Sequence, residues 1–345
     1  MHAEEMWKVS TGAGVTVAVV DTGVDPSLPD LQGQVLPGQD LSGIEGDDRP
    51  DYDGHGTKMA VLISGKGDGG RGSFGLAPGA KILPFKVASL RAPRTHLLPG
   101  ATVRRAIRAA ADSDAKVINV SMGAPAADPE DAKAIEYAIG KGKLVFASAG
   151  NRGDKENGAE YPAAYPGVVG VAAVDQDIKA PSWSVRGPQV DLAAPGDNMV
   201  TTCLGGTGVC RSHGTSDAAA LASASAALIW SAHPDWTANQ VLRVLINTAG
   251  GPKNGDKRSD SIGYGVVRPR IALQNPGDPG PPDVSPLPEL AAAKSPGPEA
   301  GRASAHDNDS LLSKRNLITT GACVAVAGAA TAAALLFRRR RAHTN

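Results

Sequence analysis

Residues 15–25 read VTVAVVDTGVD, a continuous apolar run of strand length that ends in an acidic turn. Such a run is typical of a strand that is buried on both faces of a parallel sheet. Runs of the same length and character occur at residues 116–121, 144–149 and 168–174. Together these segments predict a parallel sheet whose first strand is residues 15–20.

Segments of helical length and spacing lie between and after these runs, at residues 101–111, 128–140, 216–232 and 237–248. Strands that alternate with helices predict an α/β fold, with a doubly wound parallel sheet flanked by helices. In such folds ligands bind beyond the carboxyl ends of the strands. The residues that follow each strand are therefore the first candidates for a functional site.

The composition of the 345-residue chain excludes several classes of protein. A hydrophobic share of 41% is enough for a sizeable core and excludes a wholly disordered chain. The 35 basic and 35 acidic residues give no net charge, which argues against a nucleic-acid-binding protein. Three cysteines exclude a disulfide-dense small scaffold and a four-cysteine zinc site. We expect no nucleic-acid partner, no metal and no other cofactor.

The C-terminal part of the chain has a different composition. Residues 275–300 contain eight prolines and little that could fill a core, so residues 275–316 are predicted to form a disordered linker. Residues 317–337, LITTGACVAVAGAATAAALLF, carry no charge. As a helix they would span about 31 Å, close to the thickness of a bilayer core. We expect a transmembrane helix there. The arginines at 338–341 would place the basic tail, residues 338–345, in the cytoplasm and everything before the helix outside it.

Two further readings concern the ends of the chain. Residues 317–321, LITTG, loosely resemble the LPxTG pentapeptide of cell-wall sorting signals, although Ile318 departs from it; a cell-wall-sorted protein is thus an alternative. Residues 1–7, MHAEEMW, have neither the basic start nor the apolar run of an export signal. Because the expected topology requires export, we expect a missing N-terminal segment.

Asp21 and Asn151 each stand directly after or near the end of a predicted strand. Taken alone, either residue is more often a cap or a turn former. The DTG triplet that contains Asp21 is also a feature of aspartic proteases. That chemistry needs two carboxylates that share a proton, and the chain contains no second DTG.

His55 and Ser216 are the other candidates. His55 lies in DYDGHGTKMAVLISG, and no partner at helical ligand spacing supports a metal site. A histidine that acts as a general base needs an acidic partner and a nucleophile. Ser216 lies in SHGTSDAAALASASAALIW, at the start of a long helix whose N–H groups and dipole favour a developing oxyanion. The simpler reading of Ser216 is an N-cap serine.

The chain order of Asp21, His55 and Ser216, with Asn151 between the last two, is the order recorded for subtilisin-type triads. The segments VAVVDTGVD, DGHGTKMAVLISG, SAGN and GTSDAA resemble the four signature segments of the subtilisin-like serine proteases (peptidase S8 family), and the likeness extends over about residues 7–273. It implies a peptidase domain at residues 1–274. It also implies that Asp21 orients His55, that His55 deprotonates Ser216, and that Asn151 and the Ser216 backbone N–H hold the oxyanion.

The same resemblance implies residues that bind the substrate. Ser121, Met122 and Gly123 match the segment on which a peptide pairs as an added strand. Ala149 and Gly150 match one wall of the pocket for the side chain before the scissile bond. Small residues in that wall suit a medium or large apolar side chain.

The overall architecture resembles the mycosins, the membrane-anchored serine proteases associated with type VII secretion in actinobacteria. Residues 2–7, HAEEMW, are similar to a segment of that group. The resemblance implies a polypeptide substrate, a single-pass membrane location with the catalytic domain outside the cytoplasm, and type VII secretion membrane components as partners.

Three residues depart from the family pattern. Ala220 stands where proline is usual, Asp217 where an aromatic residue or methionine is usual, and Val61 where glycine is usual. Asp217 adds negative charge beside the expected oxyanion, which would slow acylation. Asp217 and Ala220 support an alternative function, a structural scaffold of a secretion complex with weak or vestigial protease activity, whereas the complete triad favours an active protease.

The cysteines differ in their surroundings. Cys203 and Cys210 frame the Gly-rich segment LGGTGV shortly before Ser216, and outside the cytoplasm we expect them to form a disulfide. Cys323 lies within the expected membrane span and is read as a small apolar residue.

Overall fold

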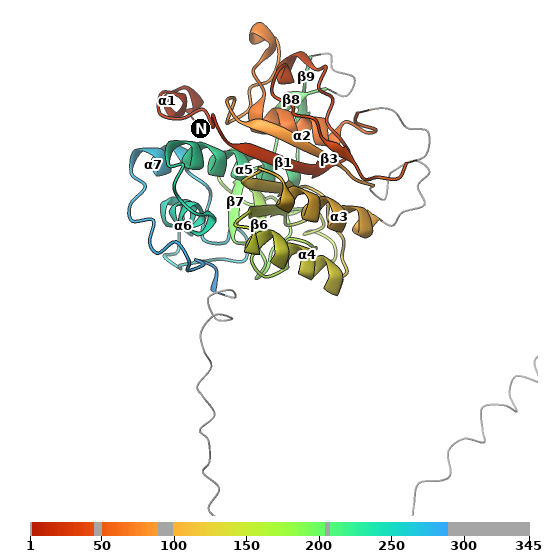
Figure 1. Ribbon diagram of the computed structural model, residues 1–345. Coiled ribbons are helices and arrows are strands. Elements are labelled where there is room, and N and C mark those ends of the chain that lie inside the picture. Colours follow the sequence, from red (N-terminus) through yellow and green to blue (C-terminus); the bar gives the residue numbers. More distant parts are fainter. Residues whose placement is uncertain (1, 45–49, 89–98, 204–207, 289–345) are drawn as a thin grey trace, which may run out of the picture. The chain divides into compact units, whose positions relative to one another are not determined.

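The computed structural model describes residues 2–44, 50–88, 99–203 and 208–288 (Figure 1). Within these residues the larger sheet has seven strands in the order β2-β3-β1-β4-β5-β6-β7, and neighbouring strands are parallel. The strands are β1 (Thr16–Asp21), β2 (Gln39–Asp40), β3 (Lys81–Lys86), β4 (Val117–Val120), β5 (Leu144–Ser148), β6 (Val169–Val174) and β7 (Leu192–Pro195). The predicted parallel sheet is confirmed, and β1 lies near its centre.

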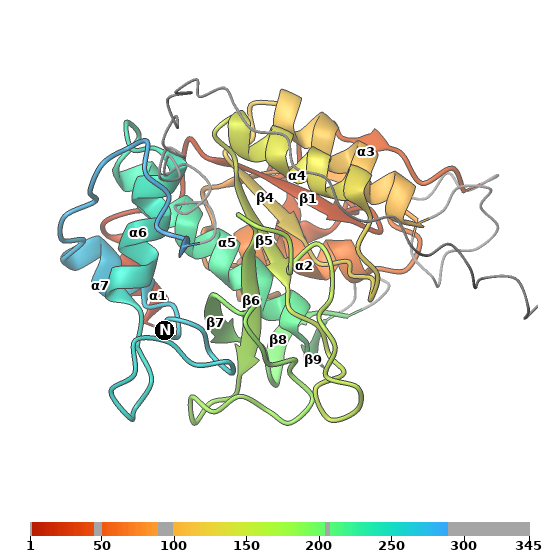
Figure 2. The same cartoon turned by 90° about the horizontal axis from the view of Figure 1, so that it is seen from below.

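Helices flank the sheet on both faces, as expected for this fold class (Figure 2). They are α1 (Ala3–Trp7), α2 (His55–Ser64), α3 (Pro99–Asp112), α4 (Pro129–Gly140), α5 (Thr215–Ala232), α6 (Ala238–Thr248) and α7 (Pro269–Gln274). Two 3₁₀ turns, η1 (Pro29–Leu31) and η2 (Asp68–Gly70), lie in the connections. The helices predicted from residues 101, 128, 216 and 237 onward correspond to α3, α4, α5 and α6.

The continuous apolar run of β1 is explained by the two layers of helices. Successive side chains of a strand point to opposite faces. Val17 and Val19 belong to the core cluster that contains α2 and α5, whereas Ala18 and Val20 belong to the cluster that contains α3 and α4. Both faces of β1 are buried, so its sequence shows no alternation of apolar and polar residues.

Helix α5 runs through the interior of the domain rather than along its surface. Every residue from Thr215 to Trp230 is buried. A helix that is apolar on all sides belongs in a core, and the many alanines allow it to approach α2 and the strands closely. This helix carries Ser216 in its first turn, so the position of Ser216 is fixed by packing over the whole length of α5.

A small antiparallel hairpin completes the described fold. It consists of β8 (Met199–Thr202) and β9 (Val209–Ser212). Cys203 and Cys210 form a disulfide within it, with Cα atoms 5.0 Å apart. The predicted disulfide is thus present, and it joins Cys210 of β9 to Cys203, the residue that follows β8.

The chain continues to pack against the domain beyond α7, over residues 275–288. Arg243 of α6 donates hydrogen bonds to the carbonyl oxygens of Pro279 and Val284, at 2.6 and 2.5 Å. The side chain of Leu287 is buried. The first part of the segment predicted as a linker therefore lies against α6 in an ordered arrangement.

The remaining predictions for the C-terminal part lie outside the described residues. These are the rest of the linker at residues 289–316, the helix at 317–337 with Cys323, and the tail at 338–345. In the part of the chain that the structure describes, no helix is both long enough and apolar enough to cross a bilayer.

Candidate active site

The four residues singled out after strands and at helix starts lie at one edge of the sheet. Asp21 is the last residue of β1, and Asn151 follows β5 by three residues. His55 is the first residue of α2, and Ser216 is the second residue of α5. His55, Asn151 and Ser216 line one cavity of about 1010 Å³, and Ser121, which follows β4, lines it as well. The edge formed by the carboxyl ends of the strands is where this fold places ligands.

Asp21 and His55 form a close pair. Oδ1 of Asp21 lies 2.7 Å from Nδ1 of His55. The Asp21 side chain is completely buried, whereas the His55 side chain is 34% exposed toward the cavity. An ionised carboxylate only accepts hydrogen bonds, so Nδ1 donates to Asp21. A neutral His55 ring then keeps the lone pair of Nε2 for a proton.

The surroundings of His55 favour its protonated form. Burial by itself lowers the pKa of His55, but the charge and the hydrogen bond of Asp21 raise it, and the charges of Asp53 and Asp217 add to this. The carboxylates prevail and raise the pKa of His55 to about 9. The protonated imidazole is therefore favoured, and the neutral form gains in population as the pH rises toward that pKa.

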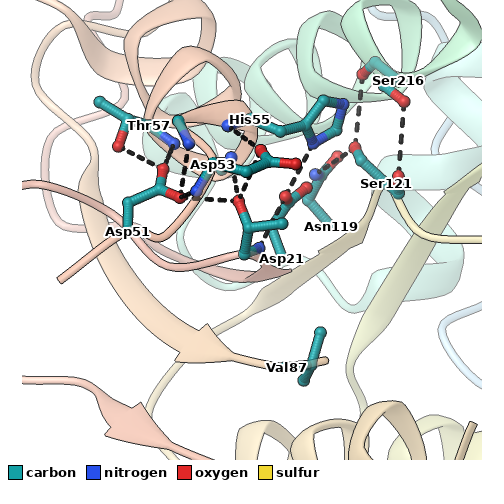
Figure 3. A network of polar contacts seen from close by, with 12 residues as sticks. Asp21, Asp51, Asp53, His55, Thr57, Val87, Asn119, Ser121 and Ser216 are labelled. Atoms are coloured by element: carbon teal, nitrogen blue, oxygen red, sulfur yellow. Dashed lines mark hydrogen bonds and ion pairs between the residues drawn. The ribbon is translucent and has the colours of Figure 1, made fainter. Parts of the chain in front are cut away.

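A network centred on Asp51 holds the start of α2 (Figure 3). Oδ2 of Asp51 accepts hydrogen bonds from the backbone N–H and the hydroxyl of Thr57, at 2.9 and 2.6 Å. Oδ1 of Asp51 accepts from the hydroxyl of Thr22 at 2.8 Å, and Oδ1 of Asp53 accepts from the N–H of His55 at 2.8 Å. Carboxylates satisfy the free N–H groups of a helix start. Asp51 was not among the residues predicted from the sequence, although an acidic residue just before a helix start is the signal for such a cap.

Gly56 allows α2 to approach the end of β1. A methyl group added to its Cα would lie 2.1 Å from the carbonyl oxygen of Gly23 and 2.9 Å from Cβ of Asp21. Any residue larger than glycine would push His55 away from Asp21. The glycine after His55 is therefore part of what sets the distance between the two side chains.

Ser216 is held at the junction of α5 and β4. Its hydroxyl donates to the carbonyl oxygen of Ser121 at 3.4 Å. A chain of hydrogen bonds supports this junction: Ser223 donates to Asn119 at 3.1 Å, Asn119 donates to the Ser121 hydroxyl at 3.0 Å, and this hydroxyl donates to the Ser216 carbonyl at 3.5 Å. Figure 3 shows Asn119 and Ser121 beneath Ser216. Asn119 and Ser223 were not among the residues predicted from the sequence; the signal for Asn119 is a polar residue inside an apolar strand.

The side-chain amide of Asn151 has a defined orientation. Its Oδ1 accepts hydrogen bonds from the backbone N–H and the hydroxyl of Thr215, at 2.9 and 3.0 Å. The hydroxyl of Thr215 in turn accepts from the N–H of Gly150 at 3.0 Å. A backbone N–H can only donate, so the oxygen of the amide faces Thr215 and its NH₂ group is available to the cavity. Thr215, which the sequence analysis did not single out, orients Asn151.

The residues expected to bind substrate lie in two different environments. Ser121, Met122 and Gly123 line the cavity. Ala149 is completely buried in a core cluster, and neither it nor Gly150 lines the cavity. Gly150 connects the buried Ala149 to Asn151, which lines the cavity.

The three departures from the family pattern are buried. Ala220 and Val61 are core residues with no exposed surface. Asp217 is 1% exposed, it adjoins the cavity, and its Oδ2 has no hydrogen-bond partner among the described residues. Burial raises the pKa of Asp217, although hydrogen bonding to Ser212 and the charges of His55 and Lys58 oppose the shift. Burial thus favours the neutral form of Asp217, whereas Ser212, His55 and Lys58 favour its carboxylate.

In the described part of the chain, no cluster of three or more histidine, cysteine or acidic residues is arranged to hold a metal ion.

Comparison with known proteins shows the family. The sequence model of the subtilase family matches residues 12–265. Thermitase of Thermoactinomyces vulgaris is 35% identical over 231 residues, which cover 65% of this chain and 80% of thermitase. Subtilisin E of Bacillus subtilis is 34% identical over 266 residues, which cover 76% of this chain and 67% of subtilisin E.

A solved structure, the MycP3 protease from the type VII (ESX-3) secretion system, superposes with a TM-score of 0.67 and 35% identity. The match covers 79% of this chain and 85% of that protein. MycP1 from Mycobacterium smegmatis superposes with a TM-score of 0.67 and 29% identity, over 81% of this chain and 84% of that protein. The chain belongs to the subtilase family and is a subtilisin-like serine protease related to the mycosins.

Proposed function

We propose that Asp21, His55 and Ser216 form the catalytic triad of this protease and that it hydrolyses peptide bonds through an acyl-enzyme. The observation that carries the proposal is the 2.7 Å contact of Asp21 with His55, at the mouth of a cavity that Ser216 and Asn151 also line. A triad is recognised by this geometry and by the roles of its members.

In the proposed reaction, Nε2 of neutral His55 removes the proton of the Ser216 hydroxyl, and Oγ attacks the peptide carbonyl. The hydroxyl now bonds to the Ser121 carbonyl, so a rotation of the Ser216 side chain must bring Oγ toward His55. Catalytic hydrogen bonds often tighten only when substrate is bound. His55 then gives its proton to the departing amine. Water, activated by the same imidazole, hydrolyses the acyl-enzyme.

The negative oxygen of the tetrahedral intermediate would be held by the NH₂ group of Asn151 and by the backbone N–H of Ser216. The Thr215 contacts that turn the amide oxygen of Asn151 away from the cavity support this role. Groups that are oriented before the reaction cost no reorganisation when charge develops, and each such donor contributes roughly 3–4 kcal/mol to lowering the barrier.

We further propose that the protease is anchored in the cell membrane by residues 317–337, with its peptidase domain outside the cytoplasm, and that it serves type VII secretion. The uncharged 21-residue run with its four following arginines supports the anchor. The similarity to MycP3 and MycP1 supports the link to secretion. Membrane components of that system would then be its partners.

The test of the triad is peptide hydrolysis by the full chain in detergent at about pH 9. Ser216→Ala is expected to reduce kcat by about a millionfold, the loss recorded when the equivalent serine of subtilisin is removed. Ser225→Ala is the matched control, since this serine lies in the same helix and bonds only to the Leu221 carbonyl four residues earlier. A Ser216→Ala protein with the turnover of the control would refute the proposal.

A second candidate function is a scaffold in a secretion complex, with weak or vestigial protease activity. It is favoured by the raised pKa of His55, which favours the protonated imidazole, and by the buried carboxyl of Asp217, whose Oδ2 has no hydrogen-bond partner among the described residues. Secretion in cells that carry Ser216→Ala distinguishes the two: a scaffold sustains secretion without its nucleophile, whereas a required protease does not.

A further inference from the structure

The first half of α5, which carries Ser216, is built almost entirely from small side chains. Residues 215–227 read TSDAAALASASAA, and Leu221 is the only large apolar residue among them. All of these residues are buried, on every side of the helix. If α5 turned by one residue and shifted along its axis, one small side chain would take the place of another. Packing therefore keeps this half of the helix in the core but discriminates weakly between neighbouring registers.

A polar pair inside this part of the core opposes such a shift. Asn119 lies in β4 and Ser223 in α5, and neither side chain has any exposed surface. The hydroxyl of Ser223 donates to Oδ1 of Asn119 at 3.1 Å. Separation of the two groups would leave a buried amide oxygen without a partner, which costs far more than the exchange of one alanine contact for another.

A second attachment of α5 lies at its first turn. Oγ of Ser216 donates to the carbonyl oxygen of Ser121 at 3.4 Å, and Oγ of Ser121 donates to the carbonyl oxygen of Ser216 at 3.5 Å. Ser223 follows Ser216 by seven residues, which is two helical turns, so both serines lie on the same face of the helix. Two attachments on one face fix the rotation of α5 and its position along the axis.

The hydrogen bonds between the two attachments run in one direction. Because Oδ1 of Asn119 accepts from Ser223, its NH₂ group faces Ser121 and donates to that hydroxyl at 3.0 Å. A serine hydroxyl has a single proton, and Ser121 gives its own to the carbonyl oxygen of Ser216. An amide turned the other way would take the Ser121 proton for itself. The orientation of Asn119 thus decides whether Ser121 holds the start of α5 (Figure 3).

We propose that Asn119 and Ser223 are positioning residues that set the register of α5 and thereby the place of Ser216. Both functional groups of Ser216 depend on this register: Oγ, which would attack the peptide carbonyl, and the backbone N–H, which would hold the oxyanion. Asn119 and Ser223 act from below, since neither lines the cavity. Buried asparagines fix the register of packed helices in coiled coils. This assignment rests on the proposed function, because it takes Ser216 as the nucleophile.

The kinetic test compares two serines of the same helix. Ser223 and Ser225 are both completely buried, but Ser225 bonds to the carbonyl oxygen of Leu221 in its own helix, at 2.7 Å. Ser223→Ala is expected to lower kcat for peptide hydrolysis by about 10- to 100-fold and to change KM by less than about twofold, because a displacement of about 1 Å costs roughly 100-fold in rate. Ser225→Ala should keep both constants. Equal kcat values for the two folded variants overturn the assignment.

A double variant separates a positioning role from a role in stability alone. Asn119→Val combined with Ser223→Ala replaces both polar groups by apolar groups of similar size, so neither residue leaves the other without a partner. The midpoint of denaturant unfolding should stay close to that of the wild-type protein. In contrast, kcat should fall by about 10- to 100-fold, as in Ser223→Ala. A double variant that retains the wild-type kcat overturns the assignment.

Amide hydrogen exchange separates this assignment from the proposed function, because it needs no turnover. Exchange is followed by mass spectrometry in the peptide that contains residues 215–222. It should be about 10-fold faster in Ser223→Ala than in the wild-type protein, and close to the wild-type rate in Ser225→Ala. An unchanged rate in Ser223→Ala overturns the positioning role. Faster exchange in Ser223→Ala, with no hydrolysis by the wild-type protein, overturns the proposed function alone.

Discussion

If His55 is the base, as proposed, its pKa sets the pH range in which we expect this protein to act. Its contact with Asp21, and the nearby carboxylates of Asp53 and Asp217, raise the pKa of the imidazole well above the ordinary value of a histidine. The contact that orients the proposed base is thus also the contact that favours its protonated form. The two effects have one cause, since a carboxylate that fixes the tautomer also stabilises the imidazolium.

Because the base must be neutral, kcat/KM is expected to rise with pH and to reach half of its plateau near pH 9. At pH 7 it should be about a hundredth of the plateau value, which is the neutral fraction at two units below that pKa. The measurement is kcat/KM for an uncharged peptide between pH 6 and pH 10.5. A profile that is half-maximal near the ordinary histidine value of about 6.5 would contradict the account.

Asp217→Asn provides the matched variant for this profile. Removal of this carboxyl takes away part of the negative charge that stabilises protonated His55. The pH at which kcat/KM is half-maximal should therefore fall. The shift should be less than about one unit, because Asp217 contributes less than Asp21 and Asp53. Glu136→Gln, an exposed change on α4, should leave the profile where it is.

Several of these residues could be found in the sequence because each stands at the end of a strand or the start of a helix. Asp21, His55, Asn151 and Ser216 belong to this group. Ser223 could not be found in this way. Its role depends on Asn119, which comes from another segment of the chain and meets it only in the folded protein.

At the scale of elements, the four strands with continuous apolar runs were predicted, and the strands without such runs were not. β1, β4, β5 and β6 are buried on both faces, and this burial is what makes their sequences uniformly apolar. Both residues of β2 are exposed and β9 is mostly exposed, so neither segment has a continuous apolar run. Pairing with neighbours, rather than local sequence, makes these segments strands.

The β8–β9 hairpin carries the disulfide and also forms part of the cavity wall, because Arg211 and Ser212 of β9 line the cavity. Replacement of Cys203 and Cys210 by serine removes the constraint on the unfolded chain. The free energy of unfolding should fall by about 2.5 kcal/mol in the chain-entropy description of a loop of this length. KM for peptides should rise as well, since β9 forms part of the cavity wall.

Denaturant unfolding of the wild-type protein and of this double variant measures the first effect, and peptide kinetics measure the second. A reducing agent should lower the free energy of unfolding of the wild-type protein and leave that of the double variant unchanged. Identical unfolding midpoints for the two proteins would show that the disulfide does not stabilise the hairpin.

At the scale of the whole molecule, the packed part of the chain reaches beyond the boundary that composition indicates. The proline-rich composition of residues 275–288 indicates a linker, but their carbonyl groups accept hydrogen bonds from Arg243 and other side chains of α6. Prolines offer no N–H, yet they keep a carbonyl that a helix surface can bind. Composition therefore predicts poorly whether such a segment docks on a neighbouring helix.

The proposed anchor gives a prediction for the full chain. In cells, the full chain should sediment with membranes and resist extraction at alkaline pH, whereas a chain that stops after Pro296 should be released. Immunoblots of the two fractions provide the measurement. If the full chain is found in the wall fraction and its mature C-terminus ends at Thr320, the cell-wall-sorting alternative replaces the anchor.

The most direct test of the central claim is covalent labelling by a fluorophosphonate, followed by mass spectrometry of the labelled peptide. At about pH 9 the wild-type protein and Ser225→Ala should each take up one equivalent, on the peptide that contains Ser216. Ser216→Ala should take up none. Absence of the adduct from the wild-type protein, or an adduct that persists in Ser216→Ala, would contradict the assignment of Ser216 as the nucleophile.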